Sequence, residues 1–244
     1  MMVFLPEAFA FIGNDKIKSK DIADTILSEN GPLLSKYVGL ARQYNVYMSL
    51  GGFPILDTNV NKTTNTHIIL DNYGNIISSY NKIHLFDVDI PNGITIKESS
   101  WTIPGNEIIT CNTPVGKLGL TICYDIRFPG LYTKLRQYGS QILLVPSAFS
   151  FVTGSNHWEI LLRSRAIENQ SYIIASAQIG RHNNKRNSWG HSMIIDPWGT
   201  IIAQTSTKEI NTYCMCNIDI NLVNQVRQSM PIHLHEKPNI YQTS

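Results

Sequence analysis

A cysteine, a glutamate and a lysine each stand at the end of a strand-like segment, where together they could perform nucleophilic catalysis. Cys123 follows the apolar run 118–122 and precedes Pro129, where a helix is expected to begin. A nucleophile at a strand end is held rigidly, and the backbone N–H of the next residue, Tyr124, can face a developing oxyanion. On this local evidence an inert core cysteine is an equal alternative, since free cysteines in apolar strands usually only pack.

Glu7 and Lys82 are of the types that would activate such a thiol. Glu7 follows the short apolar segment 3–6, where burial at a sheet edge would raise its pKa and make it a usable base. Its alternative role is a first-turn residue that favours a helix N-terminus. Lys82 ends a hairpin strand, where its ammonium would lower the pKa of a nearby thiol and stabilise an oxyanion. Its alternative role is a solvated charge at a sheet edge.

The segments that must position these residues alternate between strand and helix patterns. Strands are expected at residues 3–6, 46–53, 66–70, 75–80, 118–123, 141–145, 172–178, 193–195, 200–203 and 213–218. Helices are expected at residues 31–44, 129–138, 156–170 and 221–228. The alternation predicts an α/β fold of mixed sheets covered by helices. Because no repeat or linker interrupts it, we expect a single domain over residues 1–244.

Composition narrows the class of protein. The net charge is +2, 43% of the residues are hydrophobic and 16% are charged, which indicates a globular chain rather than a disordered one. The basic residues form no stripe, so neither nucleic acid nor an anionic membrane is expected as a partner. No membrane span or targeting segment is visible, which favours a cytoplasmic protein in a reducing compartment. A mitochondrial form would need an upstream extension.

Neither the cysteines nor the histidines form a pattern that predicts a metal site. Cys214 and Cys216 alternate along an expected strand and should share one packed face. His233 and His235 lie in a polar tail beside prolines, where a zinc interpretation is weak. We therefore expect no metal.

Several short motifs follow one another in a fixed order through almost the whole chain. They include residues 5–9 (LPEAF), 82–87 (KIHLFD), 123–129 (CYDIRFP), 146–149 (PSAF), 153–154 (TG), 157–159 (HWE), 163–169 (RSRAIEN), 189–192 (WGHS) and 196–199 (DPWG). The first three resemble the Glu, Lys and Cys blocks of the carbon–nitrogen hydrolase (nitrilase) superfamily, and the others resemble further blocks of the same superfamily. A single block would be weak evidence, but this many in register leave little room for chance.

The resemblance implies an αββα sandwich and a cysteine-dependent amidase. In it Glu7 is the general base, Cys123 is the nucleophile, and Lys82 holds the tetrahedral intermediate with the N–H of Tyr124. Glu98 resembles a second glutamate that positions substrate or tunes Lys82. No organic cofactor is implied. Glu159 also falls in a family block, but the pattern 156–159 fits a helix capping box, which we favour.

Two features depart from the family's pattern. Members begin with a strand and a helix before the LPE motif, whereas only residues 1–4 precede it here, so a βα unit of roughly 30–40 residues is expected to be missing. Loss of an interior strand would expose neighbouring strand edges. The glutamate that usually follows the RFP sequence is Gly130, which removes a carboxylate near the start of the next helix.

Within the superfamily, the similarity is greatest to the deaminated glutathione amidases. It rests on residues 177–182 (AQIGRH), 185–186 (KR), 189–193 (WGHSM), 230–231 (MP) and 237–241 (KPNIY). The implied reaction cleaves the amide that joins a 2-oxoglutarate unit to cysteinylglycine. The alternatives are an ω-amidase that acts on α-ketoglutaramate and a non-catalytic nitrilase-like scaffold.

An anionic 2-oxo acid needs a fixed cation, and Arg127 is the candidate for a bidentate clamp. The alternative role of Arg127 is a structural pair with Asp125. Phe149 and Thr153 resemble family residues that line the same pocket. For a low-pKa thiol at Cys123 we expect alkylation by iodoacetamide ahead of the other cysteines.

The resemblance also implies a homodimer or homotetramer. Family helices after the cysteine and around the HWE motif pack across a two-fold axis, and here these are residues 129–138 and 156–170. Leu131, Trp158 and Leu162 could serve such a contact, or they could face their own sheet.

Overall fold

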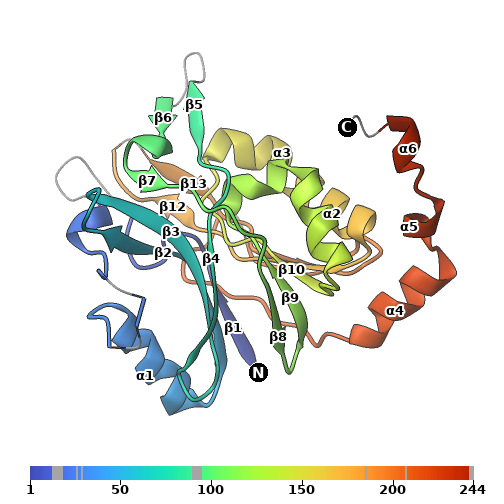
Figure 1. Cartoon of the computed structure of the whole chain (residues 1–244), viewed down its shortest axis with the longest axis horizontal. Helices are drawn as coiled ribbons and strands as arrows, with labels where there is room; N and C mark the ends of the chain where they lie inside the picture. Colours follow the sequence, from blue (N-terminus) through green and yellow to red (C-terminus); the bar gives the residue numbers. More distant parts are fainter. Residues whose placement is uncertain are drawn as a thin grey trace.

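Two β-sheets lie face to face at the centre of the molecule, and helices cover their outer faces (Figure 1). The computed structural model describes residues 1–12, 19–25, 27–28, 30–89, 95–184, 186–206 and 208–241. In the first sheet the order is β1-β2-β3-β4, with β7 paired to β3. Its strands are β1 (Met2–Leu5), β2 (Tyr47–Asp57), β3 (Lys62–Leu70), β4 (Ile76–Asn81) and β7 (Thr102–Ile103).

The second sheet has the order β15-β14-β11-β10-β9-β8. Its strands are β8 (Thr110–Thr113), β9 (Gly116–Leu120), β10 (Ile142–Leu144), β11 (Tyr172–Ala175), β14 (Met193–Ile195) and β15 (Ile201–Gln204). Two small ladders pair β5 (Asp87–Asp89) with β6 (Thr95–Lys97) and β12 (Ile179–Arg181) with β13 (Asn187–Trp189).

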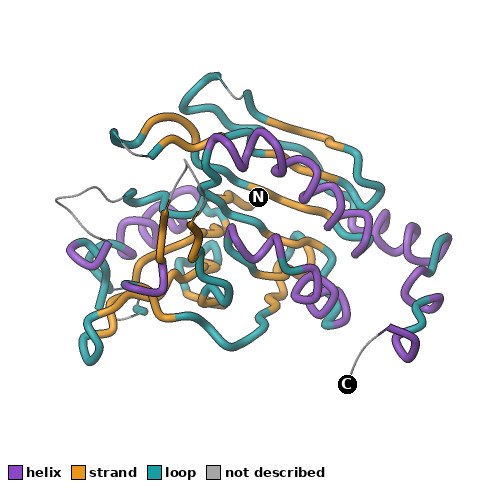
Figure 2. Tube along the Cα trace, turned by 90° about the horizontal axis from the view of Figure 1, so that it is seen from above, coloured by secondary structure: helices purple, strands orange, loops and turns teal. Residues whose placement is uncertain are grey.

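The helices form the outer layers and the C-terminal end of the described chain. They are α1 (Leu34–Tyr44), α2 (Pro129–Gln137), α3 (Phe151–Asn169), α4 (Ile220–Ser229), α5 (Ile232–His235) and α6 (Pro238–Tyr241), with 3-10 turns η1 (Ser19–Asp21), η2 (Glu98–Ser100) and η3 (Cys123–Arg127). Figure 2 shows α4, α5 and α6 leading away from the sheets toward the C-terminus. None of the helices in the described part of the chain is long and apolar enough to cross a membrane.

Side-chain alternation along β3 produces the layers. Ile68 and Leu70 are buried in one core together with Leu34 and Val38 of α1, whereas Ile69 is buried in the core that holds the second sheet. The second core continues to the helices α2 and α3 on the far side. Burying each such side chain contributes about 2 kcal/mol. The expected αββα sandwich is therefore confirmed, with α1 on the first sheet and α2 and α3 on the second.

A β-bulge replaces the expected strand end at Gly51 and Gly52. β2 continues to Asp57, and its register with β3 shifts between Leu50 and Phe53. Gly52 has φ +82°, and a Cβ there would come within 2.9 Å of the backbone of Glu7. The glycine therefore lets the turn that carries Glu7 approach β2 closely.

Two other segments also differ from the expectation. α3 begins at Phe151 and is capped by Ser150, whose hydroxyl accepts from the N–H of Thr153 at 3.3 Å. The capping-box interpretation of residues 156–159 is therefore wrong, because Asn156 lies inside the helix. Residues 213–218 form no strand, although Cys214 and Cys216 still pack against the core while Met215 is 80% exposed.

The side chains proposed for a two-fold contact lie inside the subunit. Leu131, Trp158 and Leu162 are 6%, 1% and 0% exposed and belong to the core between the second sheet and its helices. They face their own sheet, which confirms the second of the two alternatives. The apolar side chains that α3 does expose include Val152 and Ile160.

Candidate active site

Cys123 stands on a tight turn between the two sheets. β9 ends at Leu120, three residues before it, and Cys123 opens the 3-10 turn η3 with a left-handed φ of +48°. Its N–H donates to the carbonyl of Pro146 at 2.9 Å, which anchors the turn to the segment after β10. A left-handed non-glycine residue is strained and persists only where its surroundings fix it.

The buried carboxylate of Asp125 fixes that turn. It accepts hydrogen bonds from the hydroxyl of Tyr80 at 2.6 Å and from the N–H of Ile122 at 2.9 Å. It also accepts from the backbone N–H of His84 at 3.1 Å and from its Nδ1 at 2.7 Å. Asp125 thus joins the nucleophile's turn to the segment on either side of Lys82, and it is not the partner of Arg127.

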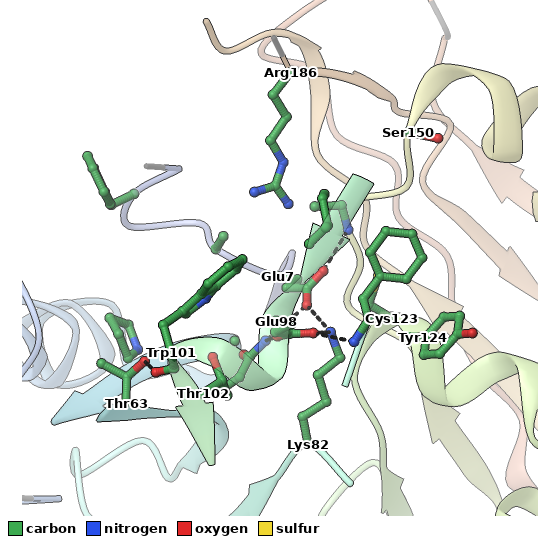
Figure 3. Close-up of a pocket in the computed structure, with 18 of the residues that line it drawn as sticks. Glu7, Thr63, Lys82, Glu98, Trp101, Thr102, Cys123, Tyr124, Ser150 and Arg186 are labelled. Carbon is green, nitrogen blue, oxygen red and sulfur yellow. Dashed lines mark hydrogen bonds and ion pairs between the residues drawn. The ribbon is translucent and has the colours of Figure 1, made fainter. Parts of the chain in front are cut away.

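Lys82 lies buried between two carboxylates (Figure 3). Its Nζ is 2.9 Å from Oε1 of Glu7 and 2.9 Å from Oε2 of Glu98. Burial alone would lower the pKa of Lys82, but the two carboxylates outweigh it and raise the pKa above its ordinary value. The side chain is therefore a fixed ammonium, available to stabilise a developing negative charge.

Glu7 follows β1, lies beside the bulge at Gly52, and points into the site. Its Oε1 accepts from Lys82 and from Nδ2 of Asn65 at 3.0 Å, and its Oε2 accepts from the N–H of Ala148 at 3.1 Å. Burial would raise the pKa of Glu7, but the Lys82 ammonium and hydrogen bonds from Cys123 and Lys82 hold it below the usual range. The expectation of a raised pKa is wrong, because the neighbouring charge and donors outweigh burial.

The thiol of Cys123 also departs from its expected electrostatics. Burial and the adjacent Glu7 carboxylate raise its pKa, and the Lys82 ammonium opposes this only in part. The resting group is therefore a neutral thiol beside an ionised carboxylate. Preferential alkylation of a resting thiolate is not what this geometry favours; the pair is arranged for general-base activation during attack.

Glu98 opens η2 and holds Lys82 from the other side. Its Oε2 accepts from the N–H of Phe86 at 2.7 Å as well as from Lys82, and its Oε1 accepts from Asn65 at 3.3 Å. Its side chain is 11% exposed, and its oxygens are largely taken by these donors. This geometry suits a residue that positions Lys82.

All eight residues expected from the sequence line one cavity of about 1140 Å³. They are Glu7, Lys82, Glu98, Cys123, Tyr124, Arg127, Phe149 and Thr153. The guanidinium of Arg127 lies over the ring of Phe149, 5.5 Å from its centroid, and its Nη2 is 3.2 Å from Nδ1 of His157. Both contacts leave other guanidinium donors for a ligand in the cavity.

Several residues of the site were not expected from the sequence. Asn65 bridges Glu7 and Glu98, and Gln178 donates from Nε2 to the carbonyls of Glu7 and Ala8 at 3.1 Å each. Asn65 lies in an unbroken run of polar residues, 62–67, where nothing in the local pattern distinguishes it. Arg186 lies within a motif quoted for the resemblance, but only the fold brings it to the cavity.

No cluster of three or more histidine, cysteine, aspartate or glutamate side chains that could hold a metal ion occurs among the described residues. Glu7, Lys82 and Glu98 are instead paired with each other. The arrangement supplies a thiol, a carboxylate that bonds to it, an ammonium, and a cavity next to all three.

Comparison with known proteins places this geometry in a family. Residues 1–228 match the family model described as "Carbon-nitrogen hydrolase". Deaminated glutathione amidase of Dictyostelium discoideum is 48% identical over 97% of this chain and 82% of its own length. The human enzyme of the same name is 43% identical over 98% of this chain and 73% of its own length.

Solved structures show the same fold. The Caenorhabditis elegans NitFhit protein superposes with a TM-score of 0.90 at 45% identity over 99% of this chain, which spans 58% of the NitFhit chain. Saccharomyces cerevisiae Nit3, described as a member of branch 10 of the nitrilase superfamily, has a TM-score of 0.83 at 31% identity over 95% of this chain and 81% of its own. The chain therefore belongs to the carbon–nitrogen hydrolase family of the nitrilase superfamily, and it is a hydrolase that acts on carbon–nitrogen bonds.

Proposed function

We propose that this amidase hydrolyses deaminated glutathione to 2-oxoglutarate and cysteinylglycine. The observation that carries the proposal is the contact of a neutral Cys123 thiol with the Glu7 carboxylate beside the Lys82 ammonium, in a cavity large enough for a tripeptide-sized amide. The identity of 43–48% to enzymes named deaminated glutathione amidase supports the choice of substrate.

The chemistry proceeds through a thioester. Glu7 accepts the thiol proton as Sγ of Cys123 attacks the amide carbonyl, and Lys82 stabilises the oxyanion together with the N–H of Tyr124. Glu7 then gives the proton to the nitrogen of the leaving amine as the carbon–nitrogen bond breaks. Water, deprotonated by Glu7, attacks the thioester, and the departing thiolate recovers a proton. No step needs a metal or an organic cofactor.

Arg127 binds the 2-oxo acid end of the substrate in this proposal. Its planar guanidinium is held on the turn of the nucleophile and against Phe149, so a bidentate pair with a carboxylate loses little freedom. Phe149 and Thr153 shape the wall beside it. Replacing Arg127 by Lys should weaken use of every 2-oxo acid amide, while thermal unfolding changes little.

A direct product assay tests the proposed substrate. Purified protein is given deaminated glutathione or α-ketoglutaramate, and 2-oxoglutarate release is followed by mass spectrometry. The proposal predicts a higher kcat/KM for deaminated glutathione. A higher value for α-ketoglutaramate would assign the chain to the ω-amidases instead, and equal absence of turnover with both amides would leave only a scaffold role.

We also propose that the chain forms a homodimer or homotetramer in the cytoplasm. Free cysteines, two of them only partly buried, suit a reducing compartment, and α3 exposes apolar side chains such as Ile160. Light scattering at micromolar concentration should give an even multiple of the subunit mass. A monodisperse monomer would overturn the assembly.

A further inference from the structure

The cavity is lined by basic side chains in addition to Lys82. Four basic and two acidic side chains line it among the described residues, and Lys82 is already paired with both acids at 2.9 Å. The remaining cations are Lys20, Arg127 and Arg186. Deaminated glutathione carries two carboxylates, one on the 2-oxo acid and one on the glycine of the leaving dipeptide. A single clamp at Arg127 accounts for only one of them.

Arg186 is held at the tip of the β12–β13 hairpin and reaches into the cavity. Its backbone N–H donates to Oδ1 of Asn183 at 2.9 Å, and its carbonyl accepts from the N–H of His182 at 2.9 Å. Figure 3 shows its side chain extending toward Glu7. Within the described part of the chain, no hydrogen bond or ion pair takes up this guanidinium, although its charge contributes to the low pKa of Glu7.

The chemistry decides which end of the substrate lies near Arg186. Glu7 must pass a proton to the leaving nitrogen, so the amine lies within hydrogen-bond reach of Glu7 and the dipeptide begins there. Arg127, by contrast, lies on the same turn as Tyr124, whose N–H stabilises the acyl oxygen in the proposed mechanism. An extended dipeptide spans about 7 Å, which carries its carboxylate well beyond the base. Of the three remaining cations, Arg186 is the one that extends toward Glu7 and whose charge acts on it (Figure 3).

We propose that Arg186 binds the terminal carboxylate of the cysteinylglycine leaving group and so selects amides whose amine portion carries a carboxylate. The inference rests on the proposed function and extends it from the acyl side to the leaving-group side. α-Ketoglutaramate, whose leaving group is ammonia, offers nothing to this residue. Arg127 and Arg186 thus recognise opposite ends of one dianion.

The test is a double-mutant cycle in which one change is made in the enzyme and the other in the substrate. Wild type and Arg186→Gln are assayed with deaminated glutathione and with its analogue in which the glycine carboxylate is an amide. Arg186→Gln should lower kcat/KM for the natural substrate about tenfold or more, as loss of a charge-assisted hydrogen bond does. With the amidated analogue the two enzymes should differ far less, because the interaction is already gone. Arg186→Lys should restore part of the loss.

Two further variants serve as controls. Arg181→Gln removes the same charge from the same hairpin, but Arg181 bonds to the carbonyl of Asn183 and to Asn184 and does not line the cavity. If Arg181→Gln discriminates between the two substrates as strongly, hairpin conformation and not ligand binding is responsible, and the inference fails. If Lys20→Gln shows the coupling instead of Arg186→Gln, Lys20 is the receptor and the inference is again wrong.

The outcomes separate the inference from the proposed function. If wild type does not use deaminated glutathione, both are overturned. If wild type uses it but Arg186→Gln lowers kcat/KM equally for both substrates, the proposed function stands and the assignment of Arg186 fails. A uniform decrease of that kind would reflect only the effect of Arg186 on Glu7.

Discussion

Two buried carboxylates lie close to the nucleophile, and they differ in what surrounds them. Asp125 is fully buried, and donors from Tyr80, His84 and Ile122 occupy both of its oxygens. Glu7 is also buried, but its partners include a titratable thiol and an ammonium, and it faces a cavity. The same functional group therefore fixes geometry in one place and can move protons in the other.

Replacing Glu7 by Gln should cause the largest loss of activity among these variants. The amide keeps the size of the side chain but cannot accept the thiol proton, so kcat should fall about 10³-fold or more. Because Glu98 still pairs with Lys82 at 2.9 Å, the fold should persist. Steady-state kinetics with deaminated glutathione and circular dichroism of the same preparation measure both. Retention of more than a tenth of the wild-type kcat would contradict the role of Glu7.

Replacing Asp125 by Asn should act first on stability. The amide nitrogen would face N–H and O–H donors, which leaves buried groups unsatisfied and costs about 3 kcal/mol of unfolding free energy. Chemical denaturation measures this loss. Ser147→Ala is a milder control, because among the described residues its buried hydroxyl bonds only to the carbonyl of Val145, at 3.2 Å. Activity should fall as well, since the turn of Cys123 loses its anchor. Unchanged stability would show that Asp125 does not hold the turn.

His67 is a third buried titratable group, and unlike Asp125 and Glu7 it is buried in its neutral form. Its Nδ1 donates to the carbonyl of Thr121 across the sheets at 3.0 Å, and its Nε2 accepts from Ser49 at 2.7 Å. Burial lowers the pKa of His67 from 6.5 to about 4, against the opposing effects of the Thr121 carbonyl and Asp125. The unfolded chain therefore binds a proton first as the pH falls, and stability is lost from pH 6.5 downward to about 4.

The expected loss for His67 is about 2 kcal/mol between pH 6.5 and 5. Glu7, whose pKa is lowered, contributes stability that is fully present above its ordinary value of 4.5 and is lost only below it, so it does not affect the slope between pH 6.5 and 5. Urea denaturation across this range should show the slope in wild type and a smaller slope in His67→Gln. His157→Gln, at an exposed histidine, is the control and should keep the wild-type slope. Equal slopes in wild type and His67→Gln would contradict the assignment.

Gly130→Glu should give the smallest change in unfolding free energy of these variants, and it should stabilise the protein. A Cβ at Gly130 would meet nothing within 4 Å, so the carboxylate usual in the family fits without a clash. In the first turn of α2 it should stabilise the protein by about 0.5–1 kcal/mol, through helix propensity and the helix dipole. Thermal unfolding measures the gain. A destabilised variant would indicate that neighbouring groups require the glycine.

The resemblance to the family was sufficient to predict the αββα layers and eight residues that line the cavity. Local order alone predicted only mixed sheets covered by helices, and it left a purely structural role open for Cys123, Glu7 and Lys82. The directions of the pKa shifts could not be predicted, since they depend on distances between segments far apart in the sequence, such as Glu7 and Lys82, which are 75 residues apart. The strand expected at 213–218 failed for a related reason: alternation sets which face packs, but a strand also needs a partner.

The central claim is that Cys123 carries the acyl group of the substrate. It is tested most directly by quenching wild type in acid shortly after mixing with deaminated glutathione, then locating adducts by peptide mass spectrometry. The account predicts one 2-oxoglutaryl group on the peptide that contains Cys123, and none in Cys123→Ala, which should also be inactive. Turnover by Cys123→Ala at the wild-type rate, or an adduct on Cys111, Cys214 or Cys216 instead, would contradict it.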